Sequence, residues 1–125
     1  MNSGPVKDPH REHPIPASWR PTFHAIVDAF VEGDFQLTGG IPQVIPPSEE
    51  TVEQIVESLA DYGEVLCPLS EQTWDTSVAQ WLESEWDVIV DLWTVGEGRS
   101  DLILQTRVSE SEDGYSYEIR MVYVP

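Results

Sequence analysis

Three histidines and one cysteine are the side chains best suited to metal binding or nucleophilic chemistry. His10 and His13 are close in sequence, but the proline-rich segment that holds them offers no third histidine or cysteine ligand. His24 lies beside the apolar stripe of a predicted helix, where we expect it to be partly buried. Cys67 has no basic or histidine neighbour in sequence that would activate its thiol as a nucleophile. We therefore predict no catalytic residue, no metal site and no cofactor.

Carboxylates dominate the charged residues: 23 aspartates and glutamates stand against 6 lysines and arginines, for a net charge of −17. Two carboxylates at a suitable distance could hydrolyse a glycosidic bond, but a pair among so many carries no information. No lysine or arginine occurs between Arg20 and Arg99. Such a surface repels nucleic acids and anionic membranes and attracts basic proteins. Alternatively, the acidity only keeps the protein soluble.

The segment from Gly96 to Asp101, with the sequence GEGRSD, is the sharpest local feature. Its two glycines lack the third glycine and the strand-to-helix context of a dinucleotide-binding loop. Arg99 is the basic residue nearest to a strongly acidic pair of predicted strands. Two interpretations remain open: Arg99 and Asp101 close the hairpin loop, or Arg99 binds a carboxylate of a ligand or partner.

Two helices are predicted to position these side chains. The first runs from about Trp19 to Glu32, with Ser18 as its N-cap and Gly33 as its end. Its apolar residues follow the helical period and form one stripe: Phe23, Ile26, Val27 and Phe30.

The second helix is predicted between Ser48, its N-cap, and Gly63, its C-terminal end. Its apolar stripe consists of Val52, Ile55, Val56 and Leu59. Glu53, Glu57 and Asp61 recur every four residues on the opposite side, with no lysine to pair with them. Because like charges at this spacing destabilise a helix, tertiary packing must hold it in place. We call these three residues the acidic strip and expect them to face solvent.

From Trp86 onward apolar residues alternate with period two, which predicts strands at about 86–95, 101–109 and 115–124. We expect a two-residue turn at Asp113-Gly114, which would pair Glu112 with Tyr115, and a three-residue loop that pairs Val95 with Arg99. Both registers give one apolar face, which we expect to carry the two helices. The predicted pairs on it include Trp86–Val108, Val88–Thr106, Val90–Leu104 and Leu92–Leu102.

One end of the other face of the predicted sheet carries Asp87 in a row with Arg107 and Arg120. The other end gathers Trp93 and several aliphatic residues around Asp91. A solvated face does not normally carry so many apolar residues. Residues 64–83, with two tryptophans and two short edge strands, could fold over this face. Alternatively, the face is a patch rimmed by carboxylates that suits the basic and aromatic groups of a partner, or the predicted register is wrong.

The segments Asp91-Leu92-Trp93-Thr94 and Glu97-Gly98-Arg99-Ser100-Asp101-Leu102 resemble a family of small uncharacterised bacterial domains with a D-L-W-T…E-G-R-S-D-L strand–turn–strand signature. With the helix-then-sheet order, the likeness extends over residues 19–125. It implies an α+β fold and a bacterial origin, and it brings no established activity. The last residues of the chain, 120–124, are less like the acidic ending of those domains.

We predict an α+β fold in which two N-terminal helices pack on one face of a mainly antiparallel sheet of three to five strands. The 125 residues suffice for one domain, predicted at 18–125 after a proline-rich flexible arm at 1–17. The single cysteine favours a reducing compartment. We expect a cytoplasmic protein, because no signal peptide or long apolar stretch is evident.

The favoured function is a non-enzymatic acidic module that binds a basic protein and neither nucleic acid nor membrane. A concrete form is a bacterial immunity-type protein that blocks a basic toxin or nuclease surface. The predicted partner-binding residues are Glu53, Glu57, Asp61, Asp87, Asp91, Trp93 and Arg99. The alternative is a small-molecule-binding or enzymatic pocket between helices and sheet, lined by Trp86, Trp93 and His24. A structural adaptor subunit is a third possibility.

Overall fold

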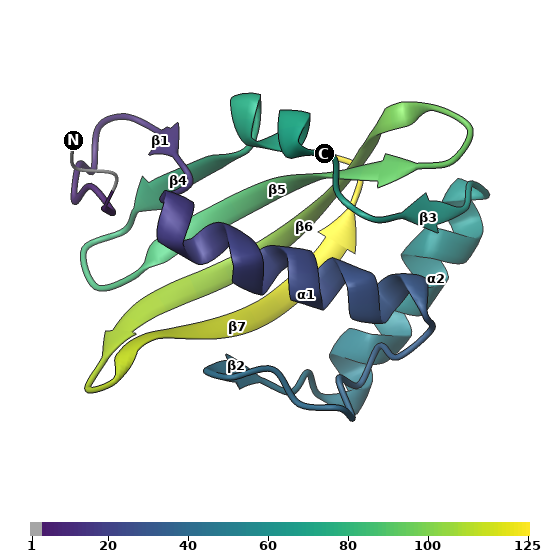
Figure 1. The fold of residues 1–125 in the computed structure, drawn as a ribbon, viewed down its shortest axis with the longest axis horizontal. Coiled ribbons are helices and arrows are strands. Elements are labelled where there is room, and N and C mark those ends of the chain that lie inside the picture. Colours follow the sequence, from purple (N-terminus) through teal and green to yellow (C-terminus); the bar gives the residue numbers. More distant parts are fainter. Residues whose placement is uncertain (1–3) are drawn as a thin grey trace.

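The computed structural model describes residues 4–125, which form a seven-stranded sheet with one long helix on its face and another at its edge (Figure 1). The strands are β1 (His13–Pro14), β2 (Val44–Ile45), β3 (Leu66–Cys67), β4 (Val78–Trp81), β5 (Trp86–Thr94), β6 (Gly98–Ser111) and β7 (Gly114–Tyr123). Their spatial order is β1-β4-β5-β6-β7-β2, and β3 pairs with β5 beside β4. Only β2 and β7 pair in parallel among the described strands.

The α+β class and the mainly antiparallel sheet are confirmed, but the sheet has more strands than the three to five predicted. The difference comes from β1 and β2, which have two residues each. The two short edge strands expected within residues 64–83 are present as β3 and β4. A two-residue strand cannot show the alternation of apolar and polar residues by which a strand is recognised in a sequence.

The first helix, α1 (Arg20–Val31), follows a short 3₁₀ helix, η1 (Ala17–Trp19). Its predicted apolar stripe is confirmed. The buried residues are Phe23, Ile26, Val27 and Phe30. Gly33 follows the helix with a φ of 84°, in the left-handed region that suits glycine after a helix end. The prediction of Ser18 as N-cap is wrong, because the 3₁₀ turn puts Trp19 at the cap position, where no side chain caps the helix.

α1 lies across one face of the sheet, and the main core lies between them (Figure 1). The ring of Trp19 is 5.3 Å from that of Trp86 in β5, and the ring of Phe23 is 5.7 Å from that of Tyr117 in β7. Both pairs meet edge to face, a favourable geometry for aromatic rings. The predicted apolar face of β5 is therefore confirmed as the face that α1 covers.

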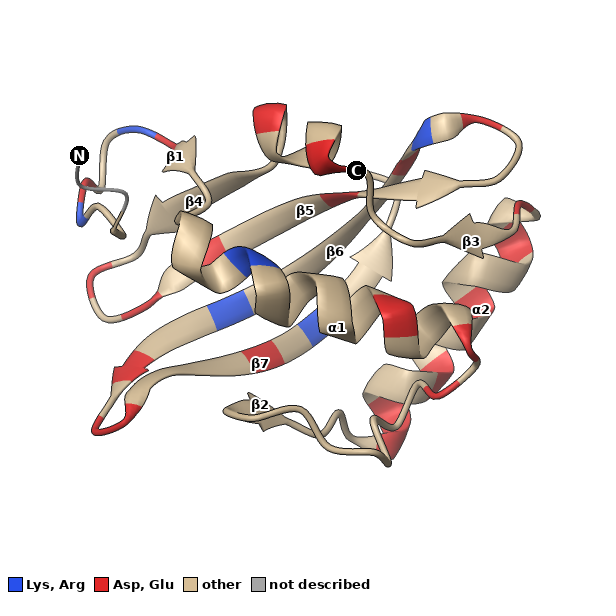
Figure 2. Ribbon diagram, viewed as in Figure 1, with Lys and Arg blue, Asp and Glu red and all other residues tan. Residues whose placement is uncertain are grey.

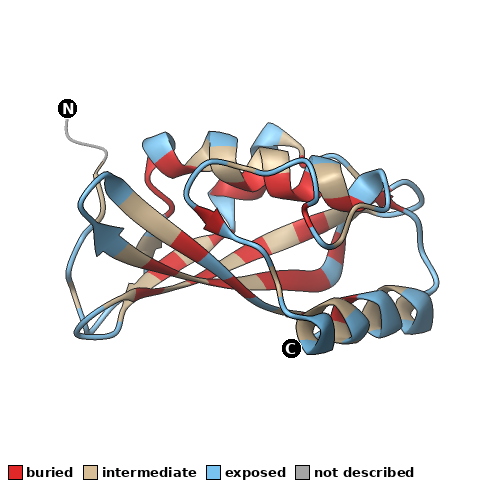
Figure 3. Cartoon of the chain, turned by 90° about the horizontal axis from the view of Figure 1, so that it is seen from below, coloured by how far each residue is buried: buried red, intermediate tan, exposed pale blue. Residues whose placement is uncertain are grey.

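The second helix, α2 (Glu49–Tyr62), has the predicted ends. The Ser48 hydroxyl accepts a hydrogen bond from the Thr51 N–H at 3.2 Å, and Gly63 has a φ of 82°. The position of α2 is not the predicted one. Instead of sharing a face with α1, it contacts β7 at the sheet edge and lies on the opposite side of the sheet from α1 (Figure 3).

Two polar side chains of α2 fix this position. The side-chain amide of Gln54 donates to the Val122 carbonyl at 2.6 Å and accepts from the Val122 N–H at 3.0 Å. The hydroxyl of Tyr62 accepts from the Asp101 N–H at 3.1 Å. Both backbone groups lie on a sheet edge that a further strand would otherwise pair, so α2 protects this edge. Apolar periodicity identifies a helix, but it does not reveal such polar contacts.

The predicted register of β5 against β6 is confirmed between Trp86 and Asp91. The confirmed pairs include Trp86–Val108, Val88–Thr106 and Val90–Leu104. Nearer the hairpin the prediction is wrong, because Trp93 rather than Val95 faces Arg99.

A bulge in β6 causes this shift. Between the pairs Asp91–Ile103 and Trp93–Arg99, β5 advances by two residues and β6 by four. Ser100 is buried in the bulge, where its hydroxyl donates to the Leu92 carbonyl at 2.8 Å and accepts from the Leu102 N–H at 3.1 Å. A serine hydroxyl thus satisfies backbone groups that the bulge removes from the ladder.

The turn between β6 and β7 also differs from the prediction. Ser111 pairs with Gly114, so the two turn residues are Glu112 and Asp113. Gly114 has a φ of 123°, which a residue with a side chain rarely adopts. The dipeptide Asp-Gly correctly marks a tight hairpin, but the glycine is the first residue of the strand.

Residues 64–83 extend the sheet at the outer edge of β5 and do not cover its second face. β3 and β4 pair with the two ends of β5, and a 3₁₀ helix, η2 (Glu71–Asp75), lies between them. The ring of Trp74 is 5.4 Å from His24 of α1, and the ring of Trp81 is 4.6 Å from that of Trp86. Both tryptophans therefore lie on the side of the sheet that α1 covers.

Residues 4–16, within the predicted arm, lie against the domain. The indole N–H of Trp86 donates to the Val6 carbonyl at 3.0 Å. The ammonium group of Lys7 is 2.9 Å from the Glu110 carboxylate and 5.2 Å from the ring centroid of Trp81. β1 pairs with β4, which covers part of the outer edge of the sheet.

Candidate functional site

The acidic strip lies on the outer side of α2, as predicted. Glu53, Glu57 and Asp61 are all exposed, while the opposite side of the helix buries Ile55. Within residues 4–125, none of the three carboxylates makes an ion pair or a hydrogen bond. Helical spacing of four residues keeps neighbouring carboxylates on one surface. The strip therefore presents uncompensated negative charge to solvent.

The strip ends beside the β5–β6 hairpin, and Tyr62 connects the two. Its hydroxyl donates to the Glu97 carboxylate at 2.9 Å and accepts the backbone N–H of Asp101. The Asp101 N–H by itself favours ionised tyrosine, but desolvation and the bond to Glu97 outweigh it, so the pKa of Tyr62 is raised above 10.0. Tyr62 stays neutral and holds the exposed carboxylates of Glu97 and Asp101 near the end of the strip.

Glu64 adds a further carboxylate at this end of the molecule. It follows Gly63, the C-cap of α2, and a side chain at Gly96 would collide with its carboxyl group. The carboxyl group of Glu64 therefore lies over the hairpin, although it is exposed. The sequence pattern does not indicate a role for Tyr62 or Glu64, because their role depends on the contact between α2 and the hairpin.

Asp87 is on the sheet face opposite α1, and its carboxylate is occupied by internal partners. It accepts from Arg107 Nε at 3.1 Å and from Gln105 Nε2 at 2.8 Å. Arg107 also donates to Glu85 at 2.9 Å. Desolvation lowers the pKa of Arg107, but the two carboxylates outweigh it and the net shift is upward. This predicted site residue therefore stabilises the sheet and has little free charge to offer.

Asp91 also has internal partners. Its carboxylate accepts from the Thr76 hydroxyl, its carbonyl accepts from the Thr73 hydroxyl at 2.6 Å, and its N–H donates to Ser77 at 2.9 Å. These hydroxyls fill the gap between β3 and β4 along the edge of β5. The backbone and side chain of Asp91 thus anchor the segment around η2.

Trp93 and Arg99 are brought together, since they are register partners near the hairpin. Trp93 is half-buried and Arg99 is exposed. Arg99 makes no ion pair with any residue in the described range, so the interpretation that it closes the loop with Asp101 gains no support. The hairpin is held instead by Thr94, whose hydroxyl donates to Glu97 at 3.0 Å, and by Tyr62.

The three residues proposed to line an internal pocket do not share one. Trp86 is buried under α1, whereas Trp93 belongs to the alternate row of β5 that faces the other way. His24 lies on α1, with its Nε2 atom 2.6 Å from the exposed Glu71 carboxylate. The three side chains therefore share no cavity. The alternative of a pocket between helices and sheet gains no support from their positions.

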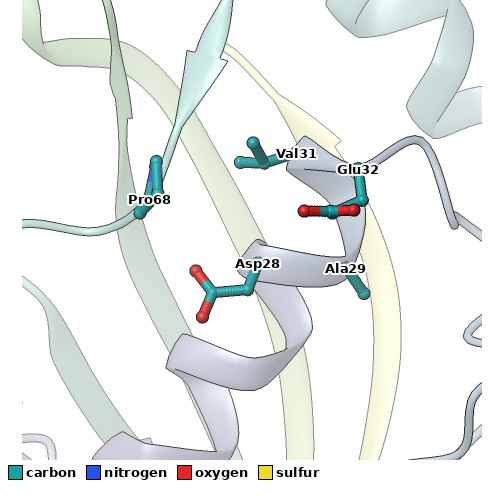
Figure 4. Close-up of a pocket in the computed structure, with 5 residues that line it drawn as sticks. All are labelled: Asp28, Ala29, Val31, Glu32 and Pro68. Carbon is teal, nitrogen blue, oxygen red and sulfur yellow. The ribbon is translucent and has the colours of Figure 1, made fainter.

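A shallow pocket lies between the end of α1 and Pro68 (Figure 4). Asp28 and Glu32, one helical turn apart, line its α1 side together with Val31. Both carboxylates are exposed and have no ion-pair partner among the described residues. The pocket contains acidic and aliphatic groups but no aromatic ring.

Two features of other functional classes are absent from the described residues. No three or more histidine, cysteine, aspartate or glutamate side chains at positions 4–125 are grouped so that they could hold a metal ion. In the same range, no helix has both the length and the apolar character needed to cross a membrane.

Most lysines and arginines lie on segments away from α2 (Figure 2). Lys7, Arg107 and Arg120 pair with carboxylates on the strands or, for Glu85, just before β5. Arg20 donates to the Ile15 carbonyl at 3.0 and 3.1 Å. These cations therefore offset acidic residues on or next to the sheet, and leave those of α2 unopposed.

Comparison with known proteins gives one match. The sequence profile of a family described as "Domain of unknown function (DUF7668)" matches residues 27–125, a range that includes α2, the hairpin and every predicted site residue. No curated protein and no solved structure matches the chain. The chain thus belongs to the DUF7668 family of domains of unknown function.

Proposed function

We propose that this protein is a non-enzymatic acidic module that binds a basic protein. The observation that carries the proposal is the acidic strip of α2, whose three carboxylates are exposed and without cationic partners among the described residues. Near its end lie the exposed carboxylates of Glu97 and Asp101. A surface of one charge sign attracts partners of the other sign and speeds their encounter.

The energetics of α2 support the same proposal. Repulsion between like charges four residues apart costs a few tenths of a kcal/mol per pair, about 0.2 to 0.5. The strip therefore makes the isolated helix less stable, and Gln54 and the buried Ile55 must hold α2 in place. A row of like charges that destabilises its own helix does not serve folding. Binding to a basic partner would explain why the row is there.

The concrete form of the proposal is a bacterial immunity-type protein that covers a basic toxin or nuclease surface. Carboxylates spaced along a helix would there take the place of the polyanion that such a surface normally binds. The residues in this role are those of the strip, together with Trp93 and Arg99 at the hairpin. Asp87 and Asp91 contribute less, because their carboxylates already have internal partners.

The test is binding, measured by calorimetry, to basic proteins encoded beside this one in the genome. The strip variant Glu53→Gln/Glu57→Gln/Asp61→Asn is compared with the control variant Glu83→Gln/Glu112→Gln/Asp113→Asn. The control removes the same charge from exposed positions in the loops at the other end of the sheet. We expect the strip variant to bind at least tenfold more weakly than the control variant, a difference of about 1.4 kcal/mol.

Two results would overturn the proposal. If no basic protein binds the wild type, the acidic surface has no partner of the expected kind. If the strip and control variants lose affinity equally, the attraction comes from net charge and not from α2.

A further inference from the structure

The acidic strip ends at a shallow depression between the C-terminal turn of α2 and the end of β7. Its lining residues are Ser58, Asp61, Tyr62, Leu102, Tyr123 and Val124. The depression thus joins one carboxylate of the strip to two phenol rings and two aliphatic side chains. No lysine or arginine lines it.

This combination suits the side chain of arginine. A guanidinium group is planar, stacks on aromatic rings and is less strongly hydrated than an ammonium group. Aromatic and aliphatic walls can take its flat faces and methylene stem, while Asp61 can accept its N–H groups. An ammonium group at the same place would keep more of its hydration and use the rings less well.

The ring of Tyr62 is fixed before any ligand arrives. Its hydroxyl is held by Glu97 on one side and by the Asp101 N–H on the other. A wall that is already ordered loses little conformational entropy on binding, which favours affinity. Tyr123 pairs with Ile103 at the end of β7, so its backbone position is fixed by the ladder.

We propose that this depression binds an arginine side chain of the basic protein partner. The inference rests on the proposed function and adds the chemical identity of the anchor residue. Asp61 would supply the charge, and Tyr62 and Tyr123 the stacking surfaces. The other shallow pocket, with Asp28 and Glu32, has carboxylates and aliphatic groups but no aromatic ring on which a guanidinium group could stack.

The experiment uses the full chain and a flexible peptide that carries several arginines as the probe. Matched peptides replace each arginine by lysine or by citrulline, a neutral residue of nearly the same shape. Affinities are measured by calorimetry, and the contact site is located by amide chemical-shift changes in nuclear magnetic resonance spectra. We expect arginine to bind best and citrulline worst, with shifts concentrated at Tyr62, Tyr123 and Val124.

Three variants test the groups of the pocket. Tyr123→Leu and Asp61→Asn should each weaken binding of the arginine peptide by roughly three- to tenfold. Tyr123→Phe keeps the ring and should keep the affinity. Asp28→Asn removes one carboxylate from the other pocket and serves as the matched control for Asp61→Asn.

The outcomes separate the two proposals. If neither the arginine peptide nor any basic protein binds the wild type, both are wrong. If the wild type binds but Tyr123→Leu and Asp61→Asn do not weaken binding, or Asp28→Asn weakens it as much, the pocket assignment is wrong and the acidic module stands. A denaturation curve for Tyr123→Leu shows whether its loss of binding reflects unfolding. If Tyr123→Leu is unfolded, the affinity of Asp61→Asn decides whether the depression is the binding site.

Discussion

The side-chain amide of Gln54 pairs with the backbone of Val122 as a strand residue would, with hydrogen bonds of 2.6 and 3.0 Å. An amide side chain has one donor group and one acceptor group, as a peptide unit does. Gln54 thereby attaches α2 to the edge of β7. Because this side of the helix faces the sheet, the acidic strip on its other side faces solvent.

Replacing Gln54 by Met should destabilise the protein by about 1 to 2 kcal/mol, because the two hydrogen bonds to Val122 and the one to the Ser58 hydroxyl are lost while the side-chain length is kept. The free energy of unfolding is measured by urea denaturation. Gln72→Met, at an exposed position in η2, is the matched control and should change it little. Hydrogen exchange at the Val122 amide should also accelerate. Equal stability of the two variants would show that Gln54 does not hold α2.

The strip variant Glu53→Gln/Glu57→Gln/Asp61→Asn should fold normally and be as stable as the wild type or slightly more stable. Each repulsive pair that is removed contributes up to about 0.5 kcal/mol. Urea denaturation and circular dichroism measure the effect. A variant that unfolds would mean that these carboxylates stabilise the fold and that their outward position has no binding role.

Trp86→Phe should loosen the N-terminal segment. The variant fills most of the buried site but removes the N–H that donates to the Val6 carbonyl. We expect faster hydrogen exchange of amides in residues 6–14, while amides in the middle of β6 serve as the internal reference. Unchanged exchange in residues 6–14 would show that the remaining contacts, such as Lys7 with Glu110, hold the segment by themselves.

Asp8 should make the N-terminal segment sensitive to acid. A hydrogen bond with His13 and then the His10 N–H lower the pKa of Asp8 below 3.8. Because the pKa of Asp8 is lower in the folded state, its contact with His13 stabilises the N-terminal segment at pH values above 3.8. This stabilisation is lost as the pH falls through the folded-state pKa of Asp8.

The carboxyl carbon shift of Asp8, followed by nuclear magnetic resonance, should therefore titrate below pH 3.8 in the wild type. In His13→Ala the midpoint should move up towards that value, because the largest cause of the shift is gone. A wild-type midpoint at or above 3.8 would contradict the account of this contact.

The sequence predicts the parts of the fold in which one pattern repeats over many residues. α2 begins after Ser48 and ends before Gly63, because a side-chain cap and a left-handed glycine are local devices. The pairing of Trp86 with Val108 follows from alternation over a long strand. The acidic strip follows from the same helical spacing that predicts α2.

Features that depend on contacts between distant segments could not be predicted. The bulge at Ser100 shifts Arg99 to face Trp93, and nothing in the alternation marks a serine as its support. Edge protection by Gln54 gives no periodic signal. The predicted register already places Asp87 beside Arg107, but it does not show that Gln105 also donates to the Asp87 carboxylate or that Arg107 also bonds Glu85.

The central claim is that an unopposed acidic surface on α2 binds a basic partner. The most direct measurement is the affinity of that partner for the wild type and for the strip variant in a series of salt concentrations that spans about 0.1 M. At this concentration interactions between exposed charges are screened beyond about 10 Å. The account predicts that wild-type affinity falls steeply with salt and that the strip variant shows a distinctly shallower dependence. An affinity that does not change with salt, or equal slopes for both proteins, would contradict it.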